Sequence, residues 1–179
     1  MEVVNKRAED AEVFFSDNTV HRLSDLWKGR PLFLVFLRHF GWPFCREQVV
    51  QLHSARKQFD ENGFQVVLVG LGTAEQAEKF RAEFSLSFPV ICDPHKELYR
   101  QYGLGRGGVS SVASPSVLLR GLRSMSRGYT PGIPRGDVMQ MPGVFLIDTE
   151  GIIRYSYFSK DASDHPPVDA LLELKNLLE

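Results

Sequence analysis

Apolar residues recur along the chain with a spacing that alternates between that of strands and that of helices. Residues 32–37 are apolar throughout, as in a buried strand, and 64–71 and 89–92 form two further apolar runs of strand length. Over 45–59 and 74–84, apolar positions recur every three to four residues, which predicts helices. The pattern therefore predicts an α/β sheet whose parallel strands are joined by right-handed helical crossovers.

Turn and capping residues mark the ends of several elements. The cluster Ser-Asp-Asn at 16–18 separates two short strand-like runs at 13–15 and 19–23, which predicts an N-terminal hairpin. Ser24 is expected to cap a short helix before the first buried strand. Thr73 is expected to cap the helix that follows it, with acidic residues near the positive end of that helix.

One long segment departs from the alternation. Residues 103–138 are rich in glycine, serine and arginine, and we expect a short helix near 118–125 with loop around it. An insertion of this length is more often a functional lid or a mobile segment than filler. The regular pattern resumes at 143–148 and 152–158, which predict a second hairpin, and a last helix is expected from about Pro166.

Composition narrows the class of protein. The 179 residues are 43% hydrophobic, which suffices for one domain with a full core, and Lys+Arg 21 against Asp+Glu 22 leaves a net charge of -1. This balance gives no bulk electrostatic drive toward nucleic acid or an anionic membrane. No apolar run approaches the roughly 20 residues of a membrane span, and the charged N-terminus lacks a secretory signal. We expect a single cytoplasmic domain over residues 1–179, without a nucleic-acid partner or a membrane span.

The two cysteines are the candidates for chemistry. Two thiols are too few for a disulfide framework or a zinc site, so we expect no metal or other cofactor. Cys45 opens a predicted helix after a strand and a turn, where unpaired N–H groups and the helix dipole lower a thiol pKa. If Cys45 is partly exposed, its pKa should fall below about 8.5. The alternative is a buried thiol that acts as a small hydrophobic residue.

Other polar residues are weaker candidates. Cys92 ends a strand, and two strand spacings would separate it from Cys45 by about 10 Å, so a disulfide would need movement. His39 is the best candidate to accept a proton or hold a thiolate, although a histidine in a turn is more often solvated or capping. Three arginines with helical spacing would either gather an anionic substrate or form a solvated face: Arg120, Arg123 and Arg127.

Three stretches resemble one known family. FLRHFGWPFC, PRGDVMQMPGVFLID and SKDASDHPP together resemble the AhpC/TSA antioxidant-enzyme-domain proteins of the peroxiredoxin-like 2 group, in the thioredoxin superfamily. This group is related to prostamide/prostaglandin F synthase. The resemblance covers nearly the whole chain from about Val13. It implies a thioredoxin-like (peroxiredoxin-like) α/β fold, with a central mixed sheet flanked by helices, an N-terminal hairpin and a C-terminal helix.

The chain departs from the family at important positions. Peroxiredoxins are similar to PxxxTxxC around the reactive cysteine, but here Arg38 and Trp42 stand at the Pro and Thr positions. Trp42 also stands where the peroxiredoxin-like 2 group often has the first cysteine of a CxxC, so Cys45 would act as a one-cysteine site. Pro142 replaces the peroxiredoxin arginine and resembles the cis-proline of thioredoxin. We therefore expect the Met141–Pro142 peptide to be cis.

The leading hypothesis is an antioxidant thiol oxidoreductase. Cys45 would attack a peroxide O–O bond or a disulfide, Arg38 would lower its pKa, and Cys92 would be a resolving thiol if one exists. The resemblance implies thioredoxin or glutathione as reductant and a small peroxide or a lipid hydroperoxide as substrate, and it leaves a homodimer open. The expected pocket residues are His39, Trp42, Pro43, Phe44, Met141 and Pro142.

Two other hypotheses remain open. One is a non-catalytic thioredoxin-fold module that binds a partner through the insertion at 103–138, with a silent Cys45. The other is a prostamide-synthase-like reductase of lipid endoperoxides, in which aromatic residues near Cys45 would line an apolar pocket. Such aromatic residues are more often core or lid packing.

Overall fold

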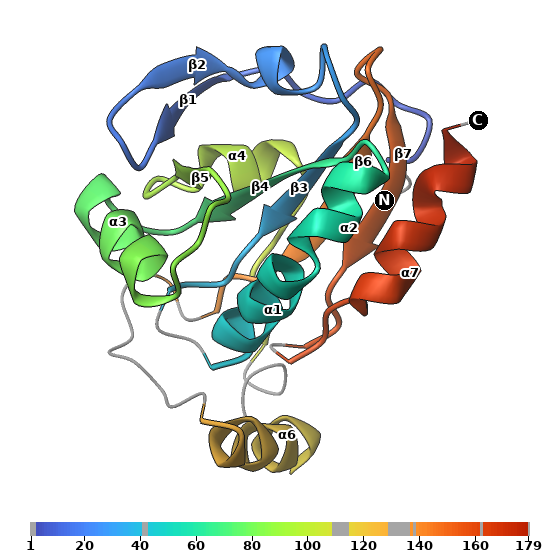
Figure 1. Cartoon of the computed structure of the whole chain (residues 1–179). Coiled ribbons are helices and arrows are strands. Elements are labelled where there is room, and N and C mark those ends of the chain that lie inside the picture. The colour runs from blue at the N-terminus through green and yellow to red at the C-terminus, as the bar shows by residue number, and fades with distance from the viewer. Residues whose placement is uncertain are drawn as a thin grey trace.

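A mixed β-sheet runs through the middle of the molecule (Figure 1). The computed structural model describes residues 3–40, 43–108, 115–128, 137, 139–161 and 163–178. Within these residues the sheet has seven strands in the order β2-β1-β5-β4-β3-β6-β7. The strands are β1 (Glu12–Phe15), β2 (Val20–Arg22), β3 (Leu32–Phe36), β4 (Gln65–Gly70), β5 (Val90–Cys92), β6 (Gly143–Ile147) and β7 (Ile153–Phe158). Both predicted hairpins are confirmed.

The centre of the sheet is parallel and its margins are antiparallel. β4 lies between β3 and β5 and is parallel to both, with Phe36 opposite Val69 and Gly70 opposite Cys92. β6 joins β3, and β1 joins β5, in antiparallel fashion. The carboxyl ends of β3 and β5 therefore meet the same edge of the sheet, which is where ligand sites of such folds occur. The predicted mixed sheet is confirmed.

Helices cover both faces of the sheet (Figure 1). They are α1 (Pro43–Ser54), α2 (Arg56–Glu61), α3 (Ala74–Glu83), α4 (Glu97–Gln101), α6 (Pro115–Ser126) and α7 (Val168–Leu172), with 3-10 helices at Leu23–Leu26 and Glu173–Leu177. Buried residues of α1, α2, α3 and α7 share one core cluster, and those of α4 share the other. No helix among the residues that the structure describes is long and apolar enough to cross a membrane.

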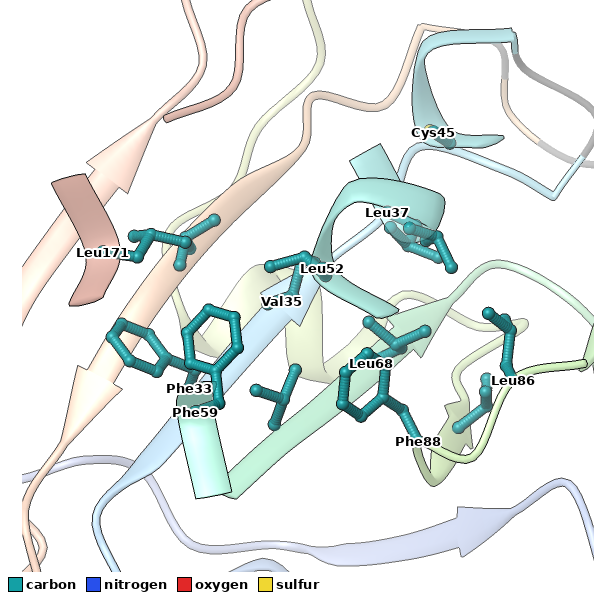
Figure 2. Packing of buried hydrophobic residues seen from close by; sticks show 14 of the residues in the cluster. Phe33, Val35, Leu37, Cys45, Leu52, Phe59, Leu68, Leu86, Phe88 and Leu171 are labelled. Carbon is teal, nitrogen blue, oxygen red and sulfur yellow. The ribbon is translucent and has the colours of Figure 1, made fainter. Parts of the chain in front are cut away.

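Strand β3 supplies both clusters, which explains its unbroken apolar sequence. Phe33 and Val35 point into the first cluster, whereas Leu32, Leu34 and Phe36 point into the second, and all five are fully buried. A parallel strand that is covered on both faces needs apolar residues at every position. Figure 2 shows the first cluster, in which residues from β3, α1, α2 and α7 meet.

Several local predictions are confirmed and others need correction. Thr73 caps α3 as part of a capping box with Gln76. The short helix before β3 is a 3-10 helix that begins at Leu23. Arg22 rather than Ser24 stands at its N-cap, so the prediction for Ser24 is wrong, and the N–H of Ser24 itself donates to the carboxylate of Asp10, 2.9 Å away. The helix predicted from Cys45 onward is interrupted at one residue, between α1 and α2.

The C-terminal half differs from prediction in two helix boundaries. The insertion at 103–138 contains α6, a helix of 12 residues that is longer than the expected 118–125 segment. The last helix begins at Val168 rather than at Pro166 and continues as a 3-10 helix. Pro167 stands at its N-cap, where an extended proline needs no N–H partner.

Candidate active site around Cys45

Cys45 lies in the first turn of α1, just beyond the carboxyl end of β3. The backbone N–H of Arg38 donates to its Sγ across 3.2 Å, and the backbone N–H of His39 also acts on the sulfur. The turn after β3 thus aims two amide donors at one sulfur atom, at the positive end of α1. Amide donors and a helix N-terminus favour the thiolate over the thiol. This is the local geometry that a reactive cysteine needs.

Burial opposes these donors. Cys45 is only 3% exposed and belongs to the first core cluster, where Figure 2 shows it at the end nearest Leu37. Burial raises the pKa of the Cys45 thiol above its ordinary value, and the two amides and the Arg38 charge lower it only in part. The lowered pKa was predicted only for a partly exposed Cys45, and this condition is not met in the present conformation. At neutral pH this conformation holds a protonated thiol.

Arg38 brings a positive charge into the interior beside the thiol. Its side chain is fully buried, and its charge interacts with Cys45 and with the carboxylate of Asp137. Burial lowers the pKa of Arg38, and these two groups raise it, but a guanidinium keeps its proton in proteins. The sequence prediction that Arg38 acts electrostatically on Cys45 fits this arrangement.

His39 is fully buried, contrary to the expectation of a solvated or capping turn residue. Burial, together with the neighbouring Arg38 charge, lowers the pKa of the imidazole to about 4. The ring is therefore neutral at pH 7, so His39 contributes no positive charge to a Cys45 thiolate. What His39 contributes to the sulfur is its backbone N–H.

Two glycines at the end of β4 make room for the turn that carries Cys45. The Phe40 ring lies so close to Gly70 and Gly72 that a Cβ on either residue would come within 2.3 Å and 2.5 Å of ring atoms. The same ring packs on Phe80 of α3, with centroids 4.9 Å apart. Phe40 therefore packs the turn after β3, which carries the Arg38 and His39 amides, against the core. The sequence signal was the glycine pair after an apolar strand, which the prediction did not use.

Tyr99 of α4 is a second residue that sequence reasoning missed. Its hydroxyl donates to the backbone carbonyls of Leu37 and Val69, the latter 3.1 Å away, and its side chain is fully buried. Leu37 immediately precedes Arg38, whose N–H donates to Cys45. Tyr99 thus holds together the carboxyl ends of β3 and β4 directly beneath the thiol.

The segment before β6 also reaches the site. Asp137 forms ion pairs with Lys96 at 2.8 Å and Arg106 at 2.9 Å, and its charge acts on Arg38. The hydrogen bond from Lys96 lowers the pKa of Asp137, so it is an anion at neutral pH. Gln140 is buried, and its side-chain amide donates to backbone carbonyls of the 104–105 turn. These contacts fix the chain where it approaches Arg38.

The Met141–Pro142 peptide is trans, because the described residues contain no cis peptide bond. The expectation of a thioredoxin-like cis-proline is wrong. The N–H of Met141 donates to the carbonyl of Gly105, and the Pro142 carbonyl accepts from the N–H of Ser159. X-Pro bonds in general prefer the trans form by about 0.5–1 kcal/mol. Pro142 itself is buried and Met141 half-buried.

The remaining predicted pocket residues separate into two groups. Trp42 and the side chain of Pro43 lie outside the described residues. Phe44 is buried, and its ring faces Gly121 of α6, where an added Cβ would lie 3.8 Å away. Phe44 and Phe40 therefore serve packing in this conformation, which was the alternative given for the aromatic residues near Cys45.

Cys92 lies at the end of β5, with β4 between it and β3. Both cysteines are free, and burial raises the pKa of Cys92 to about 11. Cys92 lines a cavity of about 500 Å³ together with residues of β1 and the start of α3. This cavity lies on the β5 side of β4, away from Cys45. Within the described residues, no cluster of three or more His, Cys, Asp or Glu side chains could hold a metal ion.

Comparison with known proteins assigns the family. The model of the AhpC/TSA family matches residues 4–156. The chain belongs to the AhpC/TSA family. It is 32% identical over 162 residues to "Thioredoxin-like protein AAED1, chloroplastic" of Arabidopsis thaliana. This match covers 84% of the chain and 64% of the Arabidopsis protein. The chain is 28% identical over 158 residues to "Peroxiredoxin-like 2C" of Homo sapiens, covering 83% of this chain and 70% of the relative.

Other relatives and solved structures agree with this family. "Prostamide/prostaglandin F synthase" of Danio rerio is 25% identical over 155 residues, covering 83% of this chain and 76% of the relative. The peroxidoxin BcpB structure from Mycobacterium tuberculosis superposes with a TM-score of 0.75 at 19% identity, covering 100% of this chain and 99% of that one. The structure of a yeast mitochondrial 1-Cys peroxiredoxin superposes with a TM-score of 0.72 at 14% identity. This match covers 98% of this chain and 76% of the yeast chain. The AhpC/TSA chain therefore has the thioredoxin-like fold of the peroxiredoxins.

Proposed function

We propose that the chain is a thiol-dependent peroxidase in which Cys45 is the reacting residue and Arg38 stabilises its charge. The observation that carries the proposal is the hydrogen bond from the Arg38 N–H to Cys45 Sγ, at the start of α1 and beside the buried Arg38 charge. A core cysteine needs no such set of donors. A nucleophilic thiolate does.

The chemistry follows from these groups. The thiolate of Cys45 attacks one oxygen of a peroxide, so that an S–O bond forms and the O–O bond breaks. The sulfur supplies two electrons, the leaving oxygen takes a proton and departs as an alcohol or water, and Cys45 becomes a sulfenic acid. A thiol reductant then displaces water to form a mixed disulfide, and a second reductant thiol releases Cys45. The Arg38 guanidinium stabilises the thiolate and the charge on the leaving oxygen.

Burial of Cys45 adds a step before attack. An enclosed thiol with a raised pKa presents little thiolate to a peroxide at neutral pH. The reaction therefore proceeds through an opened conformation in which the first turn of α1 exposes Cys45 to water. There the penalty of burial falls. The amides of Arg38 and His39 belong to the turn after β3 and not to α1, so they keep favouring the thiolate only where that turn stays beside the sulfur.

The reductant is proposed to be thioredoxin or glutathione rather than Cys92. β4 separates the ends of β3 and β5, so Cys92 would have to move to reach Cys45. Resolution through "glutathione/thioredoxin systems" is named for the yeast 1-Cys peroxiredoxin of the same fold. We further propose that residues 1–179 work as one domain in the cytoplasm, although the Arabidopsis relative is named as chloroplastic.

The test is intact-mass analysis with a sulfenic-acid trap after graded hydrogen peroxide. The native protein is compared with Cys45→Ser and with Cys92→Ser, the matched control that keeps one buried thiol. We expect one trapped sulfenic acid in the native protein and in Cys92→Ser, and none in Cys45→Ser. Labelling no faster than that of free cysteine would refute the peroxidase. A Cys45–Cys92 disulfide would instead make Cys92 the resolving thiol.

One observation favours a second candidate, the binding module with a silent Cys45. The thiol is enclosed in the first core cluster and protonated, as in an inert structural cysteine. In that case the native protein and Cys45→Ala should both fail to form a trapped sulfenic acid with hydrogen peroxide. The two proteins should also bind a partner equally well. The similarity to prostamide/prostaglandin F synthases adds a reductase of lipid endoperoxides as a variant of the first proposal. Faster trapping with lipid hydroperoxides than with hydrogen peroxide would favour that variant.

A further inference from the structure

Helix α6 exposes a row of large apolar side chains. Leu118, Leu119, Leu122 and Met125 are 67%, 70%, 58% and 44% exposed. Their spacing places them on one face of the helix. They are four of the eight large hydrophobic residues that are exposed in the described part of the chain, gathered on a single helix of 12 residues. Scattered exposed leucines are normal, but a contiguous apolar face marks a binding surface.

The other faces of α6 attach it to the body of the protein. Val117 is buried, and Gly121 faces the Phe44 ring of α1. Just beyond the helix, Arg127 pairs with the nearly buried carboxylate of Glu47 at 2.7 Å. These contacts fix the rotation of α6, so the leucine face points away from α1. Figure 1 shows α6 at one end of the molecule, beyond the layer of the sheet.

Charge indicates what this face meets. Residues 103–136 contain five arginines and no Asp or Glu, in a chain whose net charge is -1. Three of the five pair with carboxylates outside the segment, namely Arg106 with Asp137, Arg120 with Asp161 and Arg127 with Glu47. The attraction of α6 to anionic groups therefore depends on Arg123. On α6 itself, Arg120 and Arg123 are the charged residues, and both are exposed. Arg123 follows Leu122 and lies about 100° around the helix axis from it, at the border of the apolar face. A long arginine at this border can reach anionic groups while the leucines are inserted in an apolar layer.

We propose that α6 is an interfacial helix that binds the surface of an anionic lipid bilayer. An amphipathic helix with a basic polar face lies in the plane of the membrane, with its leucines at the boundary of headgroups and acyl chains. A second copy of the chain is a poorer occupant. Twelve residues give a ridge of about 18 Å by about 10 Å, or about 180 Å², against the roughly 800 Å² per partner of a stable interface.

The position of α6 connects this surface with the thiol. α6 touches α1 at Phe44, the residue next to Cys45. Because the leucine face points away from α1, a bilayer under it would lie on the far side of α6, about one helix diameter (about 10 Å) from the first turn of α1. A lipid hydroperoxide would reach Cys45 only with its polar O–O group lifted out of the bilayer surface. This choice of substrate rests on the proposed function, whereas the binding of the bilayer does not.

The experiment is flotation with vesicles of phosphatidylcholine, with and without phosphatidylglycerol. We expect the native protein to float with the anionic vesicles. Leu118→Ser and Leu122→Ser should each weaken binding about tenfold, because each removes an inserted side chain. Arg123→Gln should weaken binding about fivefold on anionic vesicles only. Val20→Ser removes a comparably exposed apolar residue, at 47%, from β2 and should change nothing.

Two controls separate the possible failures. Circular dichroism melts should show that the serine variants remain folded, since the replaced side chains are exposed. Sulfenic-acid trapping with dissolved hydrogen peroxide should be the same in Leu118→Ser, Leu122→Ser and the native protein. Absence of flotation, or equal flotation of native and serine variants, would overturn the proposal. So would a dimer in sedimentation that the serine variants dissociate without any vesicle binding. Flotation with an unreactive Cys45 would overturn only the peroxidase.

Discussion

Replacing Tyr99 with phenylalanine removes one hydroxyl from the centre of the fold and keeps the ring. The hydroxyl is fully buried and donates to the carbonyls of Leu37 and Val69. The Val69 carbonyl also accepts from the Leu37 N–H at 2.8 Å, so it keeps one donor after the change. The ring contact with Phe36, at 4.9 Å between centroids, is retained. The change therefore falls mainly on the Leu37 carbonyl, which loses its hydroxyl donor.

The magnitude follows from these hydrogen bonds. A typical internal hydrogen bond contributes about 0.5–1.5 kcal/mol, and a buried acceptor that loses its donor costs about 1–3 kcal/mol. We expect Tyr99→Phe to lower the free energy of unfolding by about 2 kcal/mol. For a chain of this size that corresponds to about 4–8 °C in Tm. Urea titration and thermal melting measure the two values independently.

Tyr102→Phe is the matched control. Its hydroxyl donates to a single carbonyl, that of Glu9, at 3.1 Å in a partly buried position. It should cost no more than about 1 kcal/mol. Tyr99→Phe should also speed alkylation of Cys45, because Leu37 precedes the amide that binds the sulfur. If Tyr99→Phe costs less than about 0.5 kcal/mol, or no more than Tyr102→Phe, the carbonyls beneath the thiol do not depend on Tyr99.

Three further changes test other parts of the site and fold. Gly70→Ala puts a Cβ 2.3 Å from the Phe40 ring, so we expect the free energy of unfolding, measured by urea titration, to fall by about 1–3 kcal/mol. A fall of less than about 0.5 kcal/mol would show that the Phe40 ring moves aside freely. Because burial raises the pKa of Cys45 above its ordinary value, its alkylation by iodoacetamide should still accelerate at a pH where a free cysteine is already fully ionised. A plateau below about pH 7 would contradict the enclosed thiol. Burial tends to raise the pKa of Asp148, but hydrogen bonds from a backbone N–H and from Arg154 outweigh it and lower the pKa. The native protein should therefore be more stable than Asp148→Asn above about pH 4 and lose that advantage as the pH falls further, and an advantage that persists at pH 2 would argue against it.

The fold was predictable because its signals are local. An apolar run such as 32–37 fits few structures other than a strand buried on both faces. Thr73 followed by Gln76 specifies a helix start through contacts within one turn. The departures arise where a distant residue decides the outcome, as when Asp10 binds the N–H of Ser24.

The position of the site was predictable from the sequence, but the burial and protonation of Cys45 were not. The sequence around Cys45 indicated a helix start beyond a strand, and the first turn of α1 is there. The pKa depends on burial, however, and burial depends on Leu37 and the core beneath it, which no local pattern reveals. Tyr99 looks like one aromatic residue of a short helix until α4 packs against the ends of β3 and β4.

The N-terminal hairpin has a consequence for any shortened form of the protein. β1 pairs with β5 through Phe14 opposite Cys92 and Phe15 opposite Ile91, so it covers the outer side of β5. Removal of the residues up to β2 would leave β5 with unpaired N–H and C=O groups along an apolar strand, and such an open edge recruits strands from other molecules. Truncated versions should therefore begin before Glu12, because later starts would favour aggregation over refolding.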